Sequence, residues 1–194
     1  MIPEFIKRVV KYLQRKGTGI LRINVFVARK TTALNQMNPG EGFRLKIINE
    51  QVWPDIQKIR GKKKVRQLKE IYKKGAYGLC FYLDSELAAY GWIGVNKQKY
   101  AQKIFGIFSI PSNSAHIFDC YTVEKFRGQN LYPSIIFNLV KLGRDKGVDD
   151  VYIDAVTDNV AAQKGIGKVG FEPVTMQTKI MILNKILFEY DRKR

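Results

Sequence analysis

The chain has 194 residues, of which 45% are hydrophobic, so it can bury a core of its own. Two cysteines and one histidine are too few for a disulfide framework or for the common zinc clusters, and we expect no metal centre. The net charge of +17 predicts a polyanionic partner, either nucleic acid, anionic lipid or a phosphate-bearing substrate, and the alternative is a basic surface without such a partner. No apolar run approaches the roughly 20 residues that cross a bilayer, and no secretion signal is visible, so we expect a cytoplasmic protein.

Residues 2–16 are predicted to form an amphipathic helix that ends at Gly17. One face is apolar and the other carries five basic side chains, Lys7, Arg8, Lys11, Arg15 and Lys16. The helix either packs on the domain with its basic face in solvent or lies on an anionic membrane surface. The second alternative would place the protein peripherally at the inner membrane face.

The next part of the chain is predicted to be mostly strand. Residues 20–30 and 43–49 each alternate apolar with polar side chains, and the two strands could form an antiparallel pair. A loop rich in Asn, Pro and Gly separates them at 31–42. Residues 79–83 and 87–95 are two apolar runs joined by a short polar turn, which is typical of a hairpin.

Residues 52–74 are predicted to be helical, with Gly61 separating two helices. Nine basic side chains flank the apolar positions of this segment: Lys58, Arg60, Lys62, Lys63, Lys64, Arg66, Lys69, Lys73 and Lys74. They form either a solvated helix face or a wall that attracts an anionic ligand.

The central segment reads as a strand, a basic turn and a helix. Residues 114–123 are rich in β-formers, and period-two alternation predicts His116, Phe118, Cys120 and Thr122 on one face, with Asp119 on the other. Arg127-Gly128 interrupts the strand, and apolar residues at helical spacing follow from Leu131. Asn130 is a suitable N-cap, and Pro133 falls in the first turn. A glycine turn that leads into a helix N-terminus is a potential anion site.

Two segments together resemble a known family. Phe126-Arg-Gly-Gln-Asn-Leu-Tyr132 resembles the coenzyme A pyrophosphate loop of the GCN5-related N-acetyltransferase (GNAT) family. Asn159-Val-Ala-Ala162 and Lys168-Val-Gly-Phe171 resemble that family's Asn-x-x-Ala and Lys-Leu-Gly-Phe elements, at the usual spacing. The match covers residues 114–175.

The sequence departs from the family pattern at three positions. Asn130 and Tyr132 replace the two small residues of the loop, and Asn tolerates a positive φ better than most residues. Ile166 stands where many members carry a tyrosine that acts as general acid.

The resemblance implies an α/β fold in which helices flank a mixed, mostly antiparallel central sheet, with an N-terminal amphipathic helix and strand as an extension. It implies one domain, divided into an N-terminal basic helix (1–17), strands with acceptor-side helices and a hairpin (18–113), a coenzyme A-binding core (114–175) and C-terminal strands (176–194).

It also implies an acyl-CoA-dependent N-acyltransferase that uses acetyl-CoA or another acyl-CoA and an amine acceptor, small or carrier-linked, such as an amino sugar. The expected cofactor-binding residues are Tyr121, Thr122, Val123, Arg127, Gly128, Gln129, Asn130, Leu131, Tyr132 and Asn159. For the chemistry we expect His116 as base, with Asp119 and Tyr132 as further catalytic candidates.

Two alternatives stay open. His116 is either this base or a half-buried strand residue with a satisfied ring, and Cys120 is expected to serve packing only. The whole chain is either the acyltransferase or a non-catalytic relative that binds nucleic acid or an anionic membrane through its basic surface. Three motif elements retained together favour the enzyme: Arg127-Gly128, Asn159 and Gly170-Phe171. Asn130, Tyr132 and Ile166 favour the relative. The oligomeric state is open, and a dimer is compatible with the sequence.

Overall fold

The structure is a computed structural model that describes residues 19–95, 111–182 and 185–193, with the side chains described up to residue 178. The amphipathic helix expected at 2–16 lies outside the described residues. Within the described part of the chain, we find no helix with the length and apolar character needed to span a bilayer.

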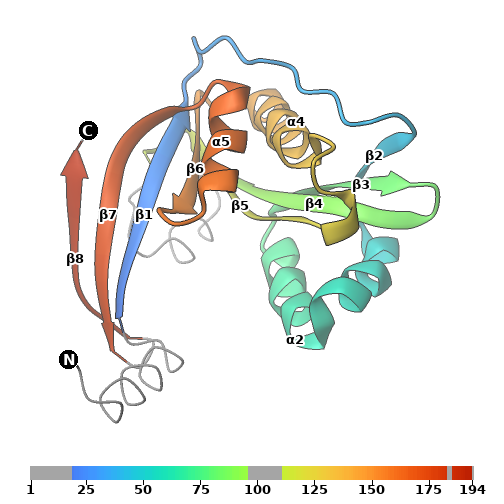
Figure 1. The fold of residues 1–194 in the computed structure, drawn as a ribbon, viewed down its shortest axis with the longest axis horizontal. Coiled ribbons are helices and arrows are strands. Elements are labelled where there is room, and N and C mark those ends of the chain that lie inside the picture. The colour runs from blue at the N-terminus through green and yellow to red at the C-terminus, as the bar shows by residue number, and fades with distance from the viewer. Residues whose placement is uncertain (1–18, 96–110, 183–184, 194) are drawn as a thin grey trace, which may run out of the picture.

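Eight strands form one sheet in the order β2-β3-β4-β5-β6-β1-β7-β8 (Figure 1). Among these strands only β5 and β6 pair in parallel, and each other neighbouring pair is antiparallel. The predicted mixed, mostly antiparallel sheet is therefore confirmed. The strand bounds are β1 Gly19–Ala28, β2 Phe43–Ile47, β3 Tyr77–Leu83, β4 Glu86–Val95, β5 Ser114–Thr122, β6 Asp150–Val156, β7 Glu172–Ile182 and β8 Lys185–Lys193.

Helices cover both faces of the sheet (Figure 1). Helix α2 (Trp53–Lys73) lies on one face, and α4 (Leu131–Asp145) and α5 (Val160–Val169) lie on the other. Short 3₁₀ turns, η1 (Glu50–Val52) and η2 (Glu124–Phe126), precede α2 and follow β5. Gly61 interrupts α2 with φ 79° and ψ 164°, which confirms the predicted separation into two helical segments.

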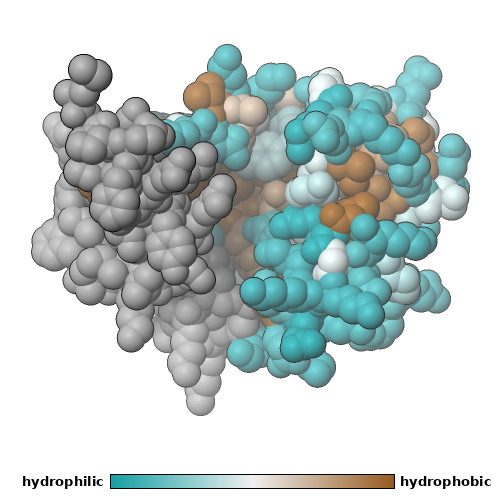
Figure 2. All heavy atoms as spheres, turned by 60° about the horizontal axis from the view of Figure 1, so that its bottom comes forward, coloured by the Kyte–Doolittle hydropathy of each residue, from teal (hydrophilic) through white to brown (hydrophobic). Residues whose placement is uncertain are grey.

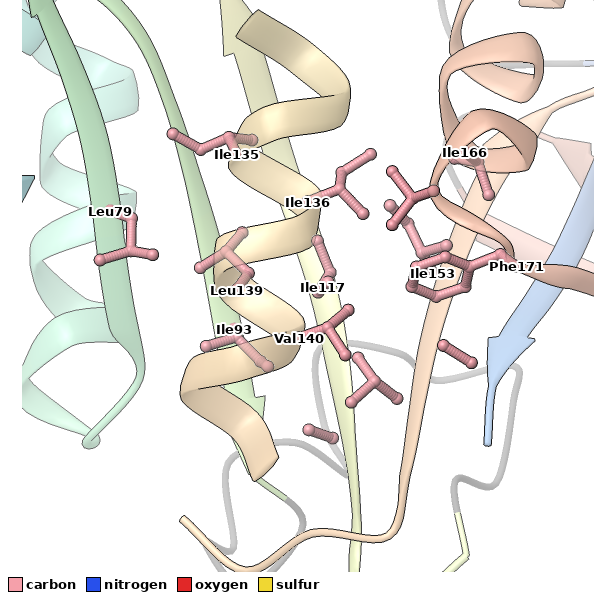
Figure 3. Close-up of a cluster of buried hydrophobic side chains, with 14 of the residues drawn as sticks. Leu79, Ile93, Ile117, Ile135, Ile136, Leu139, Val140, Ile153, Ile166 and Phe171 are labelled. Atoms are coloured by element: carbon pink, nitrogen blue, oxygen red, sulfur yellow. The ribbon is translucent and has the colours of Figure 1, made fainter. Parts of the chain in front are cut away.

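The larger core lies between α4, α5 and the sheet (Figure 3). Ile135, Ile136, Leu139 and Val140 recur at helical spacing, so they form one buried stripe on α4. This stripe packs on apolar side chains of the central strands, among them Ile117 of β5. Burial of these side chains fixes α4, and with it the turn that leads into α4.

The predicted pairing of residues 20–30 with residues 43–49 is wrong. Strand β1 lies between β6 and β7, whereas β2 forms the opposite edge of the sheet beside β3. The loop between them crosses over α4 (Figure 1), where Ser134 Oγ donates to the carbonyl of Met37 at 2.6 Å and the Arg144 guanidinium donates to the carbonyl of Arg29 at 2.9 Å. Alternation identifies a strand but not its partner, and this loop is long enough to separate the two.

Candidate active site

Strands β5 and β6 separate partway along their length. They pair from Ser114–Asp150 to Ile117–Ile153 and no further. Beyond that point β5 continues along β4, and β6 continues along β1. Past that point, the facing edges of β5 and β6 are not hydrogen-bonded to each other. Their amide and carbonyl groups can therefore bind a ligand. We call this divergence the fork.

A β-bulge bends β5 just past the fork. Asp119 and Cys120 together oppose Gly91 of β4, and Asp119 has a φ of 48°. The prediction that His116, Phe118, Cys120 and Thr122 share a face is therefore wrong beyond Phe118. Cys120 packs with the α4-side core, whereas Phe118 packs with the α2-side cluster. Asp119 faces α2 as well, on the side of Phe118, because the bulge adds a residue that resets the alternation.

Asp119 is held by two cations of α2. Lys64 Nζ lies 2.7 Å and Arg60 Nη1 3.6 Å from its carboxylate oxygens. Arg60 also donates to the Tyr90 hydroxyl at 2.7 Å and lies over the Tyr121 ring, 4.4 Å from its centroid. This network ties α2 to the bulge, so the geometry favours a positioning role for Asp119.

His116 and Asp154 form a pair across the fork. His116 Nε2 lies 2.7 Å from Asp154 Oδ1, and the two residues adjoin Ile117 and Ile153, the last paired positions. The imidazole is buried, whereas 40% of the Asp154 side chain is exposed. Asp154 was not among the sequence-based candidates. The sequence feature that could have identified it is a carboxylate that interrupts the apolar residues of β6.

The turn before α4 exposes a series of backbone N–H groups. Gly128 and Asn130 have φ values of 83° and 53°, so both adopt the left-handed conformation, which Asn tolerates as expected. In the described part of the chain, the amides of residues 128–131 have no hydrogen-bond acceptor. A Cβ atom added to Gly128 would meet nothing within 4 Å. Open amides at a helix start favour an anion.

Asn130 precedes α4, as predicted, but its side chain makes no capping hydrogen bond. Its Oδ1 instead lies 3.5 Å from Lys168 Nζ, at the end of α5. Lys168 thus brings a second cation, besides Arg127, to the turn. Lys168 belongs to a motif that the sequence shows, but no role in the site was predicted for it, and only the packing of α5 beside α4 reveals its position.

Tyr132 turns its ring toward α5. A Cβ atom on Gly165 would lie 2.6 Å from Tyr132 Cδ1, so the glycine provides the space that the ring occupies. Burial, with smaller contributions from Cys120 and Asp154, raises the pKa of Tyr132 well above its usual range, and the phenol stays neutral. Ile166, where the resemblance leads one to expect a tyrosine, is fully buried in the core.

Three further predicted residues contribute mainly through their backbone or a cap. Val123 N donates to the carbonyl of Ala88 at 2.8 Å, so antiparallel alternation directs the backbone groups of Thr122 away from β4, toward the fork. Thr122 Oγ1 is buried and has no hydrogen-bond partner among the described residues. Asn159 caps α5, because its Oδ1 accepts from the N–H of Ala162 at 3.1 Å.

No family model and no curated protein matches the sequence. Solved structures do match it. An acetyltransferase of the GNAT family from Colwellia psychrerythraea is 15% identical, with a TM-score of 0.57 over 88% of this chain and 58% of that one. A putative GNAT-family acetyltransferase from Novosphingobium aromaticivorans is 14% identical, with a TM-score of 0.58 over 82% of this chain and 63% of that one. An aminoglycoside N-acetyltransferase in complex with CoA is 18% identical, with a TM-score of 0.54 over 78% of this chain and 99% of that one.

The chain has the fold of the GCN5-related N-acetyltransferases, as the resemblance of residues 114–175 predicted. It spans less than two thirds of the length of the first two acetyltransferases. At these identities the likeness defines the fold, and the function has to be argued from the fork and from the turn before α4.

Proposed function

We propose that this protein is an acyl-CoA-dependent N-acyltransferase, with acetyl-CoA or another acyl-CoA as co-substrate. The observation that carries the proposal is the row of amides at residues 128–131 that have no acceptor among the described residues, with Arg127 and Lys168 beside it. A diphosphate bound there gains hydrogen bonds, the positive end of the α4 dipole and two cations. Asn159, which caps the neighbouring α5, stays in the proposed cofactor site.

The pantetheine arm would run from that turn into the fork. The backbone of Thr122 faces the unpaired edge of β5 and can bond to the amides of the arm as a strand would. Tyr121 and Val123 flank Thr122 and hold the opposite edge of β5 against β4. The thioester would then lie close to the point where β5 and β6 part.

At that point His116 and Asp154 approach the thioester from one side of the sheet. In the proposed transfer the amine nitrogen attacks the thioester carbonyl carbon, the C–N bond forms, and the nitrogen gives its proton to the His116–Asp154 pair. Asp154 stabilises the imidazolium ion and holds the ring in place. The C–S bond breaks, and the electron pair leaves with the sulfur.

Tyr132 would donate a hydrogen bond to the leaving sulfur from the other side of the sheet. A thiol has an unperturbed pKa of about 8.5, so the thiolate leaves without a strong acid. The pKa of Tyr132 is raised above that value, so proton transfer from the phenol is uphill. Tyr132 therefore acts as a hydrogen-bond donor to the thiolate, in the place that the resemblance assigns to a tyrosine at position 166.

The acceptor would enter from the α2 side, next to the bulge. Arg60 and Lys64 place two positive charges there against the single carboxylate of Asp119, so the local excess is positive. This charge suits an amine whose carrier bears an anionic group, such as a phosphate-linked amino sugar. The match to an aminoglycoside N-acetyltransferase supports an amine acceptor of the sugar class.

Isothermal titration of the purified protein with acetyl-CoA tests the proposal. We expect one site and a loss of affinity of at least tenfold in Arg127→Glu, because the substitution puts a negative charge beside the diphosphate. Lys141→Glu, an exposed charge reversal on α4, is the matched control and should bind as the wild type does. Absence of binding by the folded wild-type protein would refute the proposal. Release of free thiol with a panel of amino sugars then identifies the acceptor.

A further inference from the structure

The second half of α2 carries a stripe of positive charge that the acyl-transfer proposal does not use. Lys62, Arg66, Lys69 and Lys73 follow the i, i+4, i+7, i+11 spacing, so they lie along one side of the helix. We call these four residues the α2 stripe. Lys63 adjoins its beginning and Lys74 its end.

The α2 stripe is exposed and only weakly neutralised. Lys62, Arg66 and Lys73 are exposed, and Lys69 is half-buried beside the Trp53 ring, 5.7 Å from its centroid. Across its length α2 contains eight basic side chains and two acidic ones. Glu70 pairs with Lys73 at 3.2 Å, whereas Lys62 and Arg66 have no acidic partner within the described residues.

Helical spacing keeps these charges on one face, and packing fixes the direction of that face. Val65 and Leu68 are buried against the α2-side core, so the helix cannot rotate and turn the stripe away from solvent. Four like charges held within one helix face repel each other, and that repulsion is relieved when an anionic partner binds. The stripe spans 12 residues, and its ends lie about 16 Å apart along the helix, which is long enough to lie against several phosphates of one nucleic-acid backbone.

The side of the molecule that α2 covers is mainly hydrophilic (Figure 2). The large apolar side chains that are exposed in the described part of the chain belong to β1, β2, β6 and α5, and none belongs to α2. An interfacial membrane helix needs an apolar face for insertion into the lipid. The α2 stripe has charge without that face, so it suits a fully hydrated polyanion.

We propose that the α2 stripe is a binding surface for the sugar–phosphate backbone of a nucleic acid. We expect the binding to depend on charge and not on base sequence, because the Lys and Arg side chains of the stripe would contact phosphates and not base edges. This binding is independent of acyl transfer, so an experiment that refutes one of the two proposals does not refute the other.

Fluorescence anisotropy with a labelled single-stranded DNA of mixed sequence tests the inference. With four phosphate contacts, the logarithm of the binding constant should fall with the logarithm of salt concentration at a slope of about −3. Lys62→Glu/Arg66→Glu should weaken binding at least tenfold and flatten that slope. Lys141→Glu/Lys146→Glu carries the same change in net charge at two exposed positions, one on α4 and one directly after its last residue, and should bind DNA nearly as the wild type does.

Three results would overturn the inference: no binding of DNA at about 50 mM salt, an equal loss of affinity in both double variants, or binding of the wild type to phosphatidylserine vesicles but not to DNA. An equal loss would mean that the net charge of the protein, and not the stripe, attracts the DNA. Thermal unfolding shows whether each variant is folded. Titration with acetyl-CoA should give the wild-type affinity in Lys62→Glu/Arg66→Glu, which separates this surface from the proposed cofactor site.

Discussion

Gly165→Ala tests the placement of Tyr132 in the site. The added Cβ would lie 2.6 Å from Cδ1 and 3.0 Å from Cε1 of the Tyr132 ring, so the ring must move. A Cβ atom added to Gly167, two residues further along α5, would meet nothing within 4 Å. The pair Gly165→Ala and Gly167→Ala therefore makes the same chemical change in the same helix, with and without a clash.

The expected difference follows from two opposing terms. Replacing glycine by alanine within a helix contributes about 1 kcal/mol of stability at either position. Overpacking a buried contact costs about 1 to 3 kcal/mol, and only Gly165→Ala incurs that cost. The two variants should therefore differ by about 2 kcal/mol in the free energy of unfolding, or roughly 4 to 8 °C in Tm for a chain of this size.

Urea unfolding measures this difference in the free energy of unfolding. Gly165→Ala is compared with Gly167→Ala, and the double variant Tyr132→Ala/Gly165→Ala is compared with Tyr132→Ala. Without the ring, the new Cβ has no clash, so Gly165→Ala should become stabilising by up to about 1 kcal/mol. If Gly165→Ala is as stable as Gly167→Ala in the presence of Tyr132, the ring does not rest on Gly165, and its proposed role beside the thioester is lost.

Three other outcomes follow from the structure. Asp154→Asn should reduce kcat at least tenfold with little change in the Kd for acetyl-CoA, because it removes the charged partner of His116. An unchanged kcat would dismiss the pair as the base. Asn130→Ala should lower the free energy of unfolding by about 1 kcal/mol in urea titrations, because alanine tolerates the left-handed φ of 53° poorly, whereas Asn130→Gly should not lower it. Equal losses in the two variants would contradict the left-handed conformation of residue 130. Burial raises the pKa of Cys80 to about 12, so in a Cys120→Ser background iodoacetamide at pH 8 should alkylate Cys80 only after unfolding. Rapid alkylation of the folded protein would show that this thiol is accessible.

The elements near the site were predicted from local sequence patterns. Arg127-Gly128 ends a β-rich run and apolar residues then recur at helical spacing, so these patterns alone place the strand, the turn and the helix. The backbone preference of Asn130 is likewise a property of the residue itself, and the structure agrees with it. These predictions succeeded because each depends on residues only a few positions apart.

The predictions that were wrong concern contacts between segments that are distant in the sequence. One extra residue at Asp119 reversed the predicted faces of the strand, because alternation holds only while the pairing with β4 is regular. The sequence could not show that Asp154 reaches His116 across two diverging strands, or that Gly165 makes room for Tyr132.

Within the described residues, the sequence by itself determined the helices, the strands and the turn before α4, and it determined the strong positive charge of the chain, because these follow from residue type and local spacing. The tertiary structure decided where β1 joins the sheet, which groups meet at the fork and which cations remain unpaired on the described α2. The physical reason is that register and side-chain proximity arise from the packing of the whole core, to which residues far apart in sequence contribute together.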